Sequence, residues 1–393
     1  MKKIILGIDS WYPLVDGGTN VVLNYDKLLN KINKSIVIAP SFGKEADKEG
    51  EEKYHKNVFH TKSDKMAFGN FYSATPWRDK NLKKYLNEYK PDVMHIHSPF
   101  YMMRFFTRYG KKHKIPVIYT FHTKFKDDIF RFTHSHFLTA LTMIFVMYNI
   151  NRVDYVWAVS KHAADVLRSY GYKKPIRIVY NSTDMHKVVD EEINQLAKVI
   201  NKRYRISPNE KILLYIGRIV KNKNIDFSLK VIKELKNRNV KCKFLLVGKG
   251  DIDRYRKLVK KLEIEDCVQF VGPVYDRKLI GAFYSRAHLF MLPSNFDMHS
   301  LVPLEAAAYK TPTIAPTKTS FDETIENNRT GYLRVLDVKL WADCIQQSFT
   351  DDLYKQIKKN CQELVVNWDS RTEEIDHLYD EVIADYKAKH KKK

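Results

Sequence analysis

Short, continuously apolar runs alternate along the chain with longer segments in which apolar residues recur every three or four positions. The runs predict buried strands, because a strand covered on both faces is apolar at nearly every position; they lie at 3–9, 35–40, 116–121, 153–159, 211–216, 243–248 and 288–292. The amphipathic segments predict helices, among them 81–89, 161–170, 226–237, 255–262 and 276–286. This alternation predicts an α/β protein with two doubly wound, Rossmann-like domains facing a central cleft.

The length of 393 residues is enough for two domains. We expect the first domain at residues 1–190 and the second at 191–371. Residues 185–210 are polar, charged and helix-prone, and we interpret them as the linker between the domains.

A polar loop runs into an apolar helix in the sequence PSNFDMHSLVPLEAAA. Asp297 in the loop and Glu305 two turns later can face the same ligand. Ser300 is the predicted N-cap, so the amides of Leu301 and Val302 form a positive helix start suited to phosphate. This arrangement suits a nucleotide sugar, with Asp297 on a sugar hydroxyl, the amides on the diphosphate and Glu305 on the ribose. The alternative is an ordinary loop-to-helix junction.

The Asp-x7-Glu pattern in this stretch resembles the Glu-x7-Glu signature of the family 4 retaining glycosyltransferases, which have the GT-B fold. The resemblance covers nearly the whole chain. It implies transfer of a glucosyl-type hexose from a nucleotide sugar, a UDP-sugar, without a metal cofactor, and a C-terminal segment, 372–393, that crosses back to the first domain. The chain departs from the family in Asp297, where Glu is usual, and in Met298-His299-Ser300, where many members have Gly-Phe-Gly. The shorter Asp297 changes the reach to the donor sugar.

Gly17 and Gly18 lie in a predicted loop before a helix at 21–29. Glycines at such a position allow backbone amides to approach an anion closely, although any strand-to-helix turn can contain them. Together with Asp9 and Pro13, Gly17 forms a motif that resembles the opening of family members that modify lipids or teichoic-type polymers.

His122 follows the predicted strand 116–121 in the sequence HTKFKDD. In the resembled family a histidine here lies by the donor sugar; without that context, a histidine at a strand end is more often a hydrogen-bonded surface residue. His95 and His97 lie on one face of another predicted strand. No third ligand is apparent nearby, and the family has a similar pair without metal, so we predict no metal site.

Gly217 begins a turn after the strand 211–216, and Arg218 and Lys223 follow it. A converging Arg and Lys can neutralise a diphosphate and the charge of a leaving nucleotide. The spacing resembles the family's Gly-Arg…Lys-Asn motif. This resemblance implies that Arg218 and Lys223 act in catalysis, together with Asp297 and His122. The alternative is that Arg218 and Lys223 are ordinary surface charges.

Val274 follows the predicted strand 267–271, where the family binds the base mainly through the backbone. Asp251 and Asp253 resemble the metal-binding Asp-x-Asp of the other large glycosyltransferase fold. They stand just before a predicted helix, where acids favour the helix dipole, so we interpret them as a helix start.

The chain has 68 Lys and Arg against 46 Asp and Glu, a net charge of +22 spread over both halves. Such an excess suits nucleic acid or an anionic membrane, unless the whole proteome is basic. Basic and aromatic residues are mixed at 100–148. Together with the motif that resembles lipid-modifying family members, this favours an acceptor at an anionic membrane, either a membrane lipid or a cell-surface glycan. We expect no nucleic-acid partner. The alternatives are a soluble glycan or protein acceptor, an epimerase, or a non-catalytic basic binding protein.

Four cysteines lack ligand spacing, which is typical of reduced thiols in a cytoplasmic protein. The N-terminus becomes charged too soon for a signal peptide. The most apolar run, 137–148, is shorter than the roughly 20 residues of a membrane-spanning helix. We therefore expect a cytoplasmic enzyme that associates peripherally with the inner face of the cell membrane.

Overall fold

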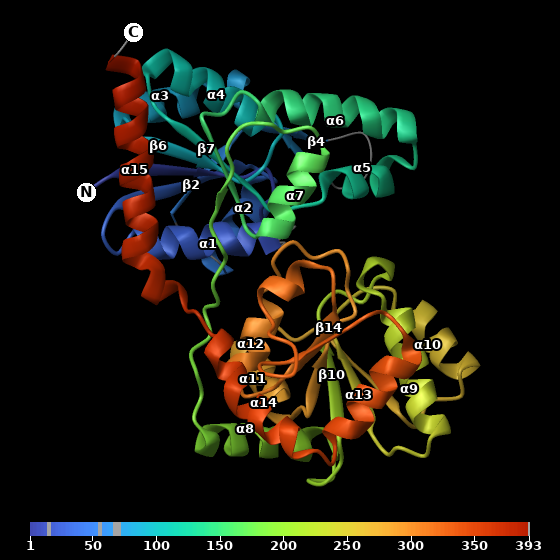
Figure 1. Ribbon diagram of the computed structural model, residues 1–393. Helices are drawn as coiled ribbons and strands as arrows, with labels where there is room; N and C mark the ends of the chain where they lie inside the picture. Colours follow the sequence, from blue (N-terminus) through green and yellow to red (C-terminus); the bar gives the residue numbers. More distant parts are fainter. Residues whose placement is uncertain (14–16, 54–56, 66–71, 392–393) are drawn as a thin grey trace. The chain divides into compact units, whose positions relative to one another are not determined.

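The computed structural model describes residues 1–13, 17–53, 57–65 and 72–391. The chain divides into two compact units, which are described separately: unit 1 is Met1–Asn181 with Trp368–Lys393, and unit 2 is Ser182–Asn367 (Figure 1). These divisions fall several residues before the predicted ones, because the segment after Asn181 belongs to unit 2. Met185 is buried in the unit 2 core, and Val188 N–H donates to Ala308 O at 2.9 Å.

Unit 1 is built on a seven-stranded parallel sheet in the order β3-β2-β1-β6-β7-β8-β9. Its strands are β1 (Lys3–Gly7), β2 (Lys34–Pro40), β3 (Val58–Thr61), β6 (Val93–Ile96), β7 (Val117–Phe121), β8 (Tyr155–Ala158) and β9 (Arg177–Ile178). A separate antiparallel pair is formed by β4 (Ser63–Lys65) and β5 (Tyr72–Ala74).

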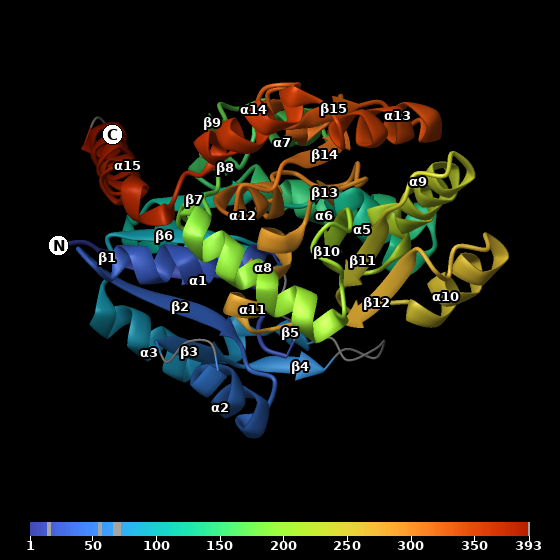
Figure 2. The same cartoon turned by 90° about the horizontal axis from the view of Figure 1, so that it is seen from below.

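Helices cover both faces of this sheet (Figures 1 and 2). They are α1 (Gly17–Leu29), α2 (Lys44–Lys53), α3 (Lys80–Tyr89), α4 (Tyr101–His113), α5 (Phe125–Thr133), α6 (His136–Ile150), α7 (Lys161–Ser169) and α15 (Thr372–Lys391), with the 3₁₀ turns η1 (Pro76–Arg78) and η5 (Trp368–Arg371). Leu6 of β1 shares a core cluster with Tyr25 of α1 and Tyr379 of α15. The next residue, Gly7, faces Phe106 of α4, because successive side chains of a strand point to opposite faces.

Unit 2 contains a six-stranded parallel sheet in the order β12-β11-β10-β13-β14-β15. Its strands are β10 (Ile212–Ile216), β11 (Lys243–Val247), β12 (Val268–Gly272), β13 (Leu289–Met291), β14 (Thr313–Pro316) and β15 (Tyr332–Arg334). Its helices are α8 (Asp190–Tyr204), α9 (Ile225–Asn237), α10 (Ile252–Lys261), α11 (Arg277–Arg286), α12 (Val302–Ala308), α13 (Val338–Ser348) and α14 (Asp352–Asn360), with the 3₁₀ turns η2 (Lys221–Lys223), η3 (Ser320–Glu323) and η4 (Cys361–Leu364).

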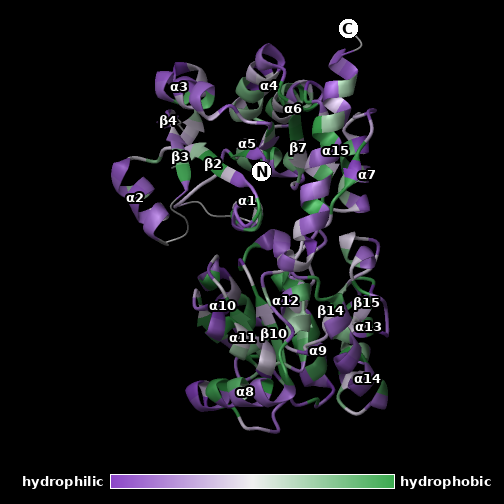
Figure 3. Ribbon diagram, turned by 90° about the vertical axis from the view of Figure 1, so that its left-hand side faces the viewer, coloured by the Kyte–Doolittle hydropathy of each residue, from purple (hydrophilic) through white to green (hydrophobic). Residues whose placement is uncertain are grey.

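The predicted fold class is confirmed, since both units are parallel sheets with helices on their faces. The strands are apolar at nearly every position because both of their faces are covered. Figure 3 shows this as hydrophobic colour on strands such as β7 and β14, and hydrophilic colour on the surface helix α2.

The interpretation of residues 185–210 as a linker is wrong. Most of that segment is α8, which packs on α11 within unit 2. Ile193 and Ile200 are buried, at 4% and 0% exposure, and Leu196 packs beside them. These three apolar positions recur at helical spacing, but the charged residues around them obscure the pattern.

Candidate functional site

Lys223 and Asp297 form a close ion pair in unit 2. The Lys223 ammonium donates to Asp297 Oδ1 at 2.7 Å and to Oδ2 at 2.9 Å. Two further bonds hold the loops that carry them: Asn224 Nδ2 donates to Pro293 O at 2.9 Å, and Ser320 Oγ donates to Asp297 O at 2.8 Å. Both paired side chains are mostly buried, with 16% and 17% exposure. The carboxylate therefore fixes the position of the ammonium.

Arg218 precedes this pair in the loop after β10 and is exposed. Its carbonyl accepts a hydrogen bond from the Tyr215 hydroxyl at 2.9 Å, while Gly217 adopts a φ of +151° that disfavours other residues. Burial raises the pKa of Tyr215, nearby Asp297 raises it further and Arg218 lowers it, so Tyr215 is close to both charges. Within the described part of the chain, no carboxylate forms an ion pair with Arg218. Its charge is available to an anionic ligand.

Glu305 of α12 is held by two residues that the sequence analysis did not identify. Its carboxylate accepts from the Tyr284 hydroxyl at 3.2 Å and pairs with Arg277 at 3.4 Å. Arg277 also pairs with Asp184. Burial raises the pKa of Glu305, and Arg277 opposes that shift. No local sequence motif predicts Arg277, because its partners lie far away along the chain.

The predicted N-cap role of Ser300 is wrong. Helix α12 begins at Val302, and Leu301 stands at the cap position without a side-chain cap bond. Pro303 in the first turn favours this start, since its fixed φ suits the beginning of a helix. The amides of Leu301 and Val302 still lie at the helix start, where they have no acceptor within the helix. Val274, the predicted base-binding residue, is half-buried just beyond β12.

Gly17 and Gly18 are not in a loop, as predicted, but form the first turn of α1. Among the described residues, a side chain on Gly17 would meet no atom within 4 Å, apart from its neighbours in the chain. The predicted motif also includes residues 14–16, which lie outside the described residues. Asp9 of the same motif accepts from the backbone N–H groups of Phe100 and Met102, and burial raises the pKa of its carboxyl to about 7.

The three histidines on β6 and after β7 lie together. His122 Nε2 and His97 Nδ1 are joined by a hydrogen bond of 2.8 Å. His95 instead bonds to the Tyr379 hydroxyl at 2.7 Å and to Thr120 Oγ1 at 2.6 Å, which is a structural role. Burial lowers the pKa of His122 to about 3, so its ring is neutral at pH 7. Within the described ranges, no group of three or more His, Cys, Asp or Glu side chains could hold a metal ion.

Two protein-family models match the chain. The model of Glycosyltransferase Family 4 matches residues 15–187, and that of Glycosyl transferases group 1 matches residues 197–364. The chain belongs to glycosyltransferase family 4. The resemblance in the sequence is thereby confirmed, and the glycosyltransferase is an enzyme of the hexosyltransferase type.

Similar proteins have related activities. The glycosyltransferase is 24% identical over 338 residues to an alpha-monoglucosyldiacylglycerol synthase of Streptococcus pneumoniae, covering 84% of this chain and 75% of that one. It is 28% identical to an N-acetyl-alpha-D-glucosaminyl L-malate synthase of Bacillus anthracis, covering 75% and 74%. The crystal structure of Anabaena HepE in complex with UDP and glucose shares its fold, with a TM-score of 0.76 at 16% identity, covering 97% and 100%.

The structure of the glycosyltransferase brings Lys223 and Asp297 together and places Arg218 close by. Glu305 has its own partners, Arg277 and Tyr284. Gly17, Gly18 and His122 belong to unit 1, whereas Gly217, Val274 and the residues around α12 belong to unit 2. None of the helices in the described ranges is long and apolar enough to cross a membrane.

Proposed function

We propose that this glycosyltransferase moves a glucosyl-type hexose from a UDP-sugar to a membrane lipid, with retention of the anomeric configuration. The main evidence for the proposed donor site is the Lys223–Asp297 ion pair beside Arg218, which forms no ion pair among the described residues. The mostly buried Lys223 and the exposed Arg218 stabilise the negative charge that grows on a leaving diphosphate. The bond between sugar C1 and the diphosphate oxygen breaks, the acceptor oxygen bonds to C1, and the acceptor proton passes to the leaving phosphate.

The remaining donor contacts follow from the same loops. Glu305, held by Arg277, binds the ribose hydroxyls, while the amides of Leu301 and Val302 face the phosphates. Asp297 contacts the sugar, and the backbone around Gly217 and Val274 contacts the nucleotide. We propose that no metal ion is needed, because side chains supply the positive charge.

The evidence for a membrane lipid acceptor is an exposed apolar stripe along α6. Phe137, Leu141, Ile144 and Tyr148 are 71%, 49%, 67% and 47% exposed and recur at intervals of four, three and four residues, so they share one helix face. We call these residues the α6 stripe. A soluble enzyme rarely exposes such a continuous apolar row unless a partner or a lipid surface covers it. With a net charge of +22, the surface that fits is an anionic membrane at the inner face of the cell membrane.

The test is a donor screen that measures released nucleotide and radiolabelled product, with and without a lipid extract. We expect UDP-glucose or a related UDP-hexose to be consumed mainly when lipid is present, with a labelled glycolipid as product. In the same assay, Ile144→Ser with Leu141→Ser should lower lipid glycosylation and vesicle binding together. Consumption without any labelled lipid contradicts the lipid acceptor.

The second candidate is transfer to a small soluble acceptor. It is favoured by the similarity to the Bacillus anthracis enzyme, whose name gives L-malate as the acceptor. Soluble hydroxy acids and oligosaccharides in the same screen distinguish the two. An acceptor that works equally well without lipid, in a protein that does not sediment with vesicles, supports this second candidate instead.

A further inference from the structure

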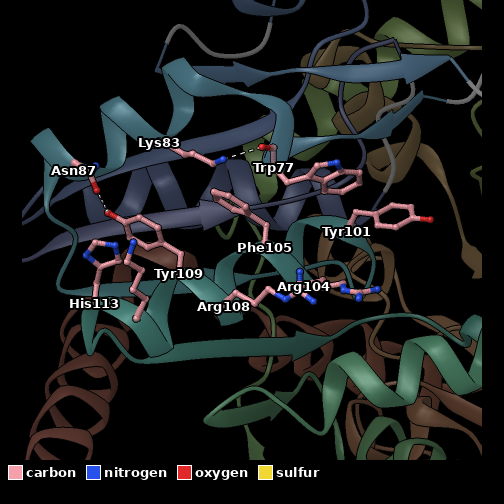
Figure 4. A pocket seen from close by; sticks show the side chains of 10 residues that line it. Trp77, Lys83, Asn87, Tyr101, Arg104, Phe105, Arg108, Tyr109 and His113 are labelled. Atoms are coloured by element: carbon pink, nitrogen blue, oxygen red, sulfur yellow. Dashed lines mark hydrogen bonds between the residues drawn. The ribbon is translucent and has the colours of Figure 1, made fainter.

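A groove of about 570 Å³ lies between α3 and α4 in unit 1 (Figure 4). Four of the side chains that line it are basic: Lys83 from α3, and Arg104, Arg108 and Lys112 from α4. Among the described residues, no acidic side chain lines it. This cavity has no part in the donor site proposed above, whose charged residues belong to unit 2.

The basic residues of the groove lack the partners that charges usually have. Helix α4 contains four Lys and Arg and no Asp or Glu. Arg104, Arg108 and Lys112 follow one another at i, i+4 and i+8, where like charges repel. Over the described ranges, none of the four groove cations forms an ion pair; the Lys83 ammonium donates only to Trp77 O, at 2.9 Å.

The helix dipole does not explain this arrangement. Basic side chains in the last turn, such as Lys112, are favoured there by the negative end of the helix. Arg104 stands in the first turn of α4, where that effect is unfavourable, and Arg108 stands near the middle, where it is weak. The groove is therefore built to receive an anion, and guanidinium groups are well suited to phosphate.

One end of the groove is aromatic and leads toward the apolar surface of α6. Trp77 and Tyr101 are 44% and 39% exposed, and their ring centroids are 5.3 Å apart. Tyr101 in turn packs against Phe145 of α6 at 5.4 Å. A ligand that fits this order has a negatively charged head group and an apolar tail.

We propose that the α3–α4 groove binds the head-group phosphate of an anionic phospholipid, with the acyl chains leaving past Trp77 and Tyr101. The inference rests on the membrane part of the proposed function and adds a discrete lipid site to it. The phospholipid is bound and not converted: its phosphate lies against Arg104 and Arg108, and the α6 stripe enters the adjacent apolar layer.

Vesicle sedimentation with a charge-matched control tests the head-group specificity. The wild type should bind phosphatidylglycerol vesicles about tenfold or more tightly than phosphatidylcholine vesicles. Arg104→Gln with Arg108→Gln should abolish that preference but leave binding to neutral vesicles unchanged. The control, Lys257→Gln with Lys260→Gln on α10 of unit 2, removes the same charge and should keep the preference. Equal losses in both variants would overturn the groove site and leave only general electrostatic attraction.

Tryptophan fluorescence tests the groove without a membrane. Four of the five tryptophans are at most 3% exposed, so Trp77 dominates the response to an added ligand. Short-chain dihexanoyl phosphatidylglycerol, kept below its micelle concentration, should shift the emission to shorter wavelength. Trp77→Phe should remove the shift, and the double arginine variant should weaken binding about tenfold or more.

Sedimentation and tryptophan fluorescence together show which of the two proposals fails, the lipid site in the groove or the docking of the enzyme on a membrane. A Trp77 shift with short-chain anionic lipid, but no sedimentation with any vesicle, keeps the groove site and contradicts membrane docking. Sedimentation through the α6 stripe without a Trp77 shift contradicts the groove site alone. If inorganic phosphate or glycerophosphoglycerol binds as tightly as the short-chain lipid, the site recognises free phosphate, and the phospholipid assignment is wrong.

Discussion

The ammonium of Lys223 lies 2.7 Å from Asp297 Oδ1, although 74 residues separate the two along the chain. The pair joins the loop after β10 to the loop after β13, the two central strands of unit 2. In parallel sheets of this kind, ligands bind at the carboxyl ends of the strands, where both of these loops begin. We therefore place the proposed donor site at this contact.

Replacing Lys223 tests its role at the leaving group. Lys223→Ala should lower kcat about 10²-fold or more, because a preorganised charge at the leaving diphosphate is lost. The neighbouring Lys221→Ala, which removes an exposed charge in the same turn, should retain nearly full activity. Thermal unfolding of both variants shows whether Asp297, left without its cation, destabilises the fold. Turnover near that of the wild type in a folded Lys223→Ala protein would remove Lys223 from the mechanism.

Removing metal ions tests whether side chains alone stabilise the negative charge of the leaving diphosphate. Activity should survive dialysis against EDTA, since in the proposed mechanism Arg218 and Lys223 supply the positive charge that a metal ion supplies in metal-dependent transferases. Initial rates before and after chelation, with Mn²⁺ and Mg²⁺ added back, are the measurement. A loss that either ion restores would contradict the prediction and direct attention to Asp251 and Asp253.

Arg277 should act on donor affinity more than on the chemical step. Arg277→Gln leaves Glu305 without its cation and frees Asp184, so the carboxylate loses its position for the ribose. We expect the KM for the UDP-sugar to rise about tenfold, with a smaller change in kcat, as for an interaction made in both ground and transition states. Titration calorimetry with UDP checks this directly, and Lys278→Gln on the same turn is the matched control. An unchanged affinity for UDP would show that Glu305 does not bind the nucleotide.

His288 makes the stability of unit 2 depend on pH. Its ring stacks on Tyr354 at 3.9 Å, and burial lowers its pKa to about 3. As the pH falls, His288 of the unfolded chain binds a proton near pH 6.5, whereas His288 of the folded protein binds one only near pH 3. The contribution of the neutral His288 ring to the free energy of unfolding is therefore fully present above pH 6.5, and it is lost as the pH falls toward 3. At pH 5.5 the loss should be about 1.4 kcal/mol.

Urea unfolding of unit 2 at pH 7.5 and 5.5 measures this loss. His288→Gln should reduce the difference between the two values by that amount. Ser348→Ala removes the hydroxyl partner of His288 but leaves the Ser348 carbonyl partner and the titratable ring, so its pH difference should remain. An undiminished difference in His288→Gln would assign the pH dependence to other groups.

The strands were the most predictable part of the fold. A strand such as β11 is apolar from end to end because helices cover both of its faces, and that pattern is local. Residues 185–210 were expected to be helix-prone, but the packing of α8 on α11 escaped prediction because charges surround the few apolar positions that make it. The start of α12 escaped it because Pro303, and not a capping side chain at Ser300, sets the first turn.

The site was predictable only where short motifs mark it. Lys223, Asp297 and Glu305 stand at fixed offsets from glycine, proline or a helix start, so their residue types carry a signal. Arg277 and Tyr284 carry none, because they reach Glu305 through folding alone, from positions 28 and 21 residues away. The groove cations are visible as a basic segment, but their common cavity requires the packing of α3 against α4.

Unit 1 is completed by the last helix of the chain, and this dictates an order of events during synthesis. Tyr379 of α15 contacts His95 and Trp157, so these contacts cannot form until residue 379 has been synthesised. Unit 2 is one uninterrupted segment and is fully synthesised before that helix. The part of the unit 1 core that Tyr379 covers can therefore close only after all of unit 2 has been synthesised.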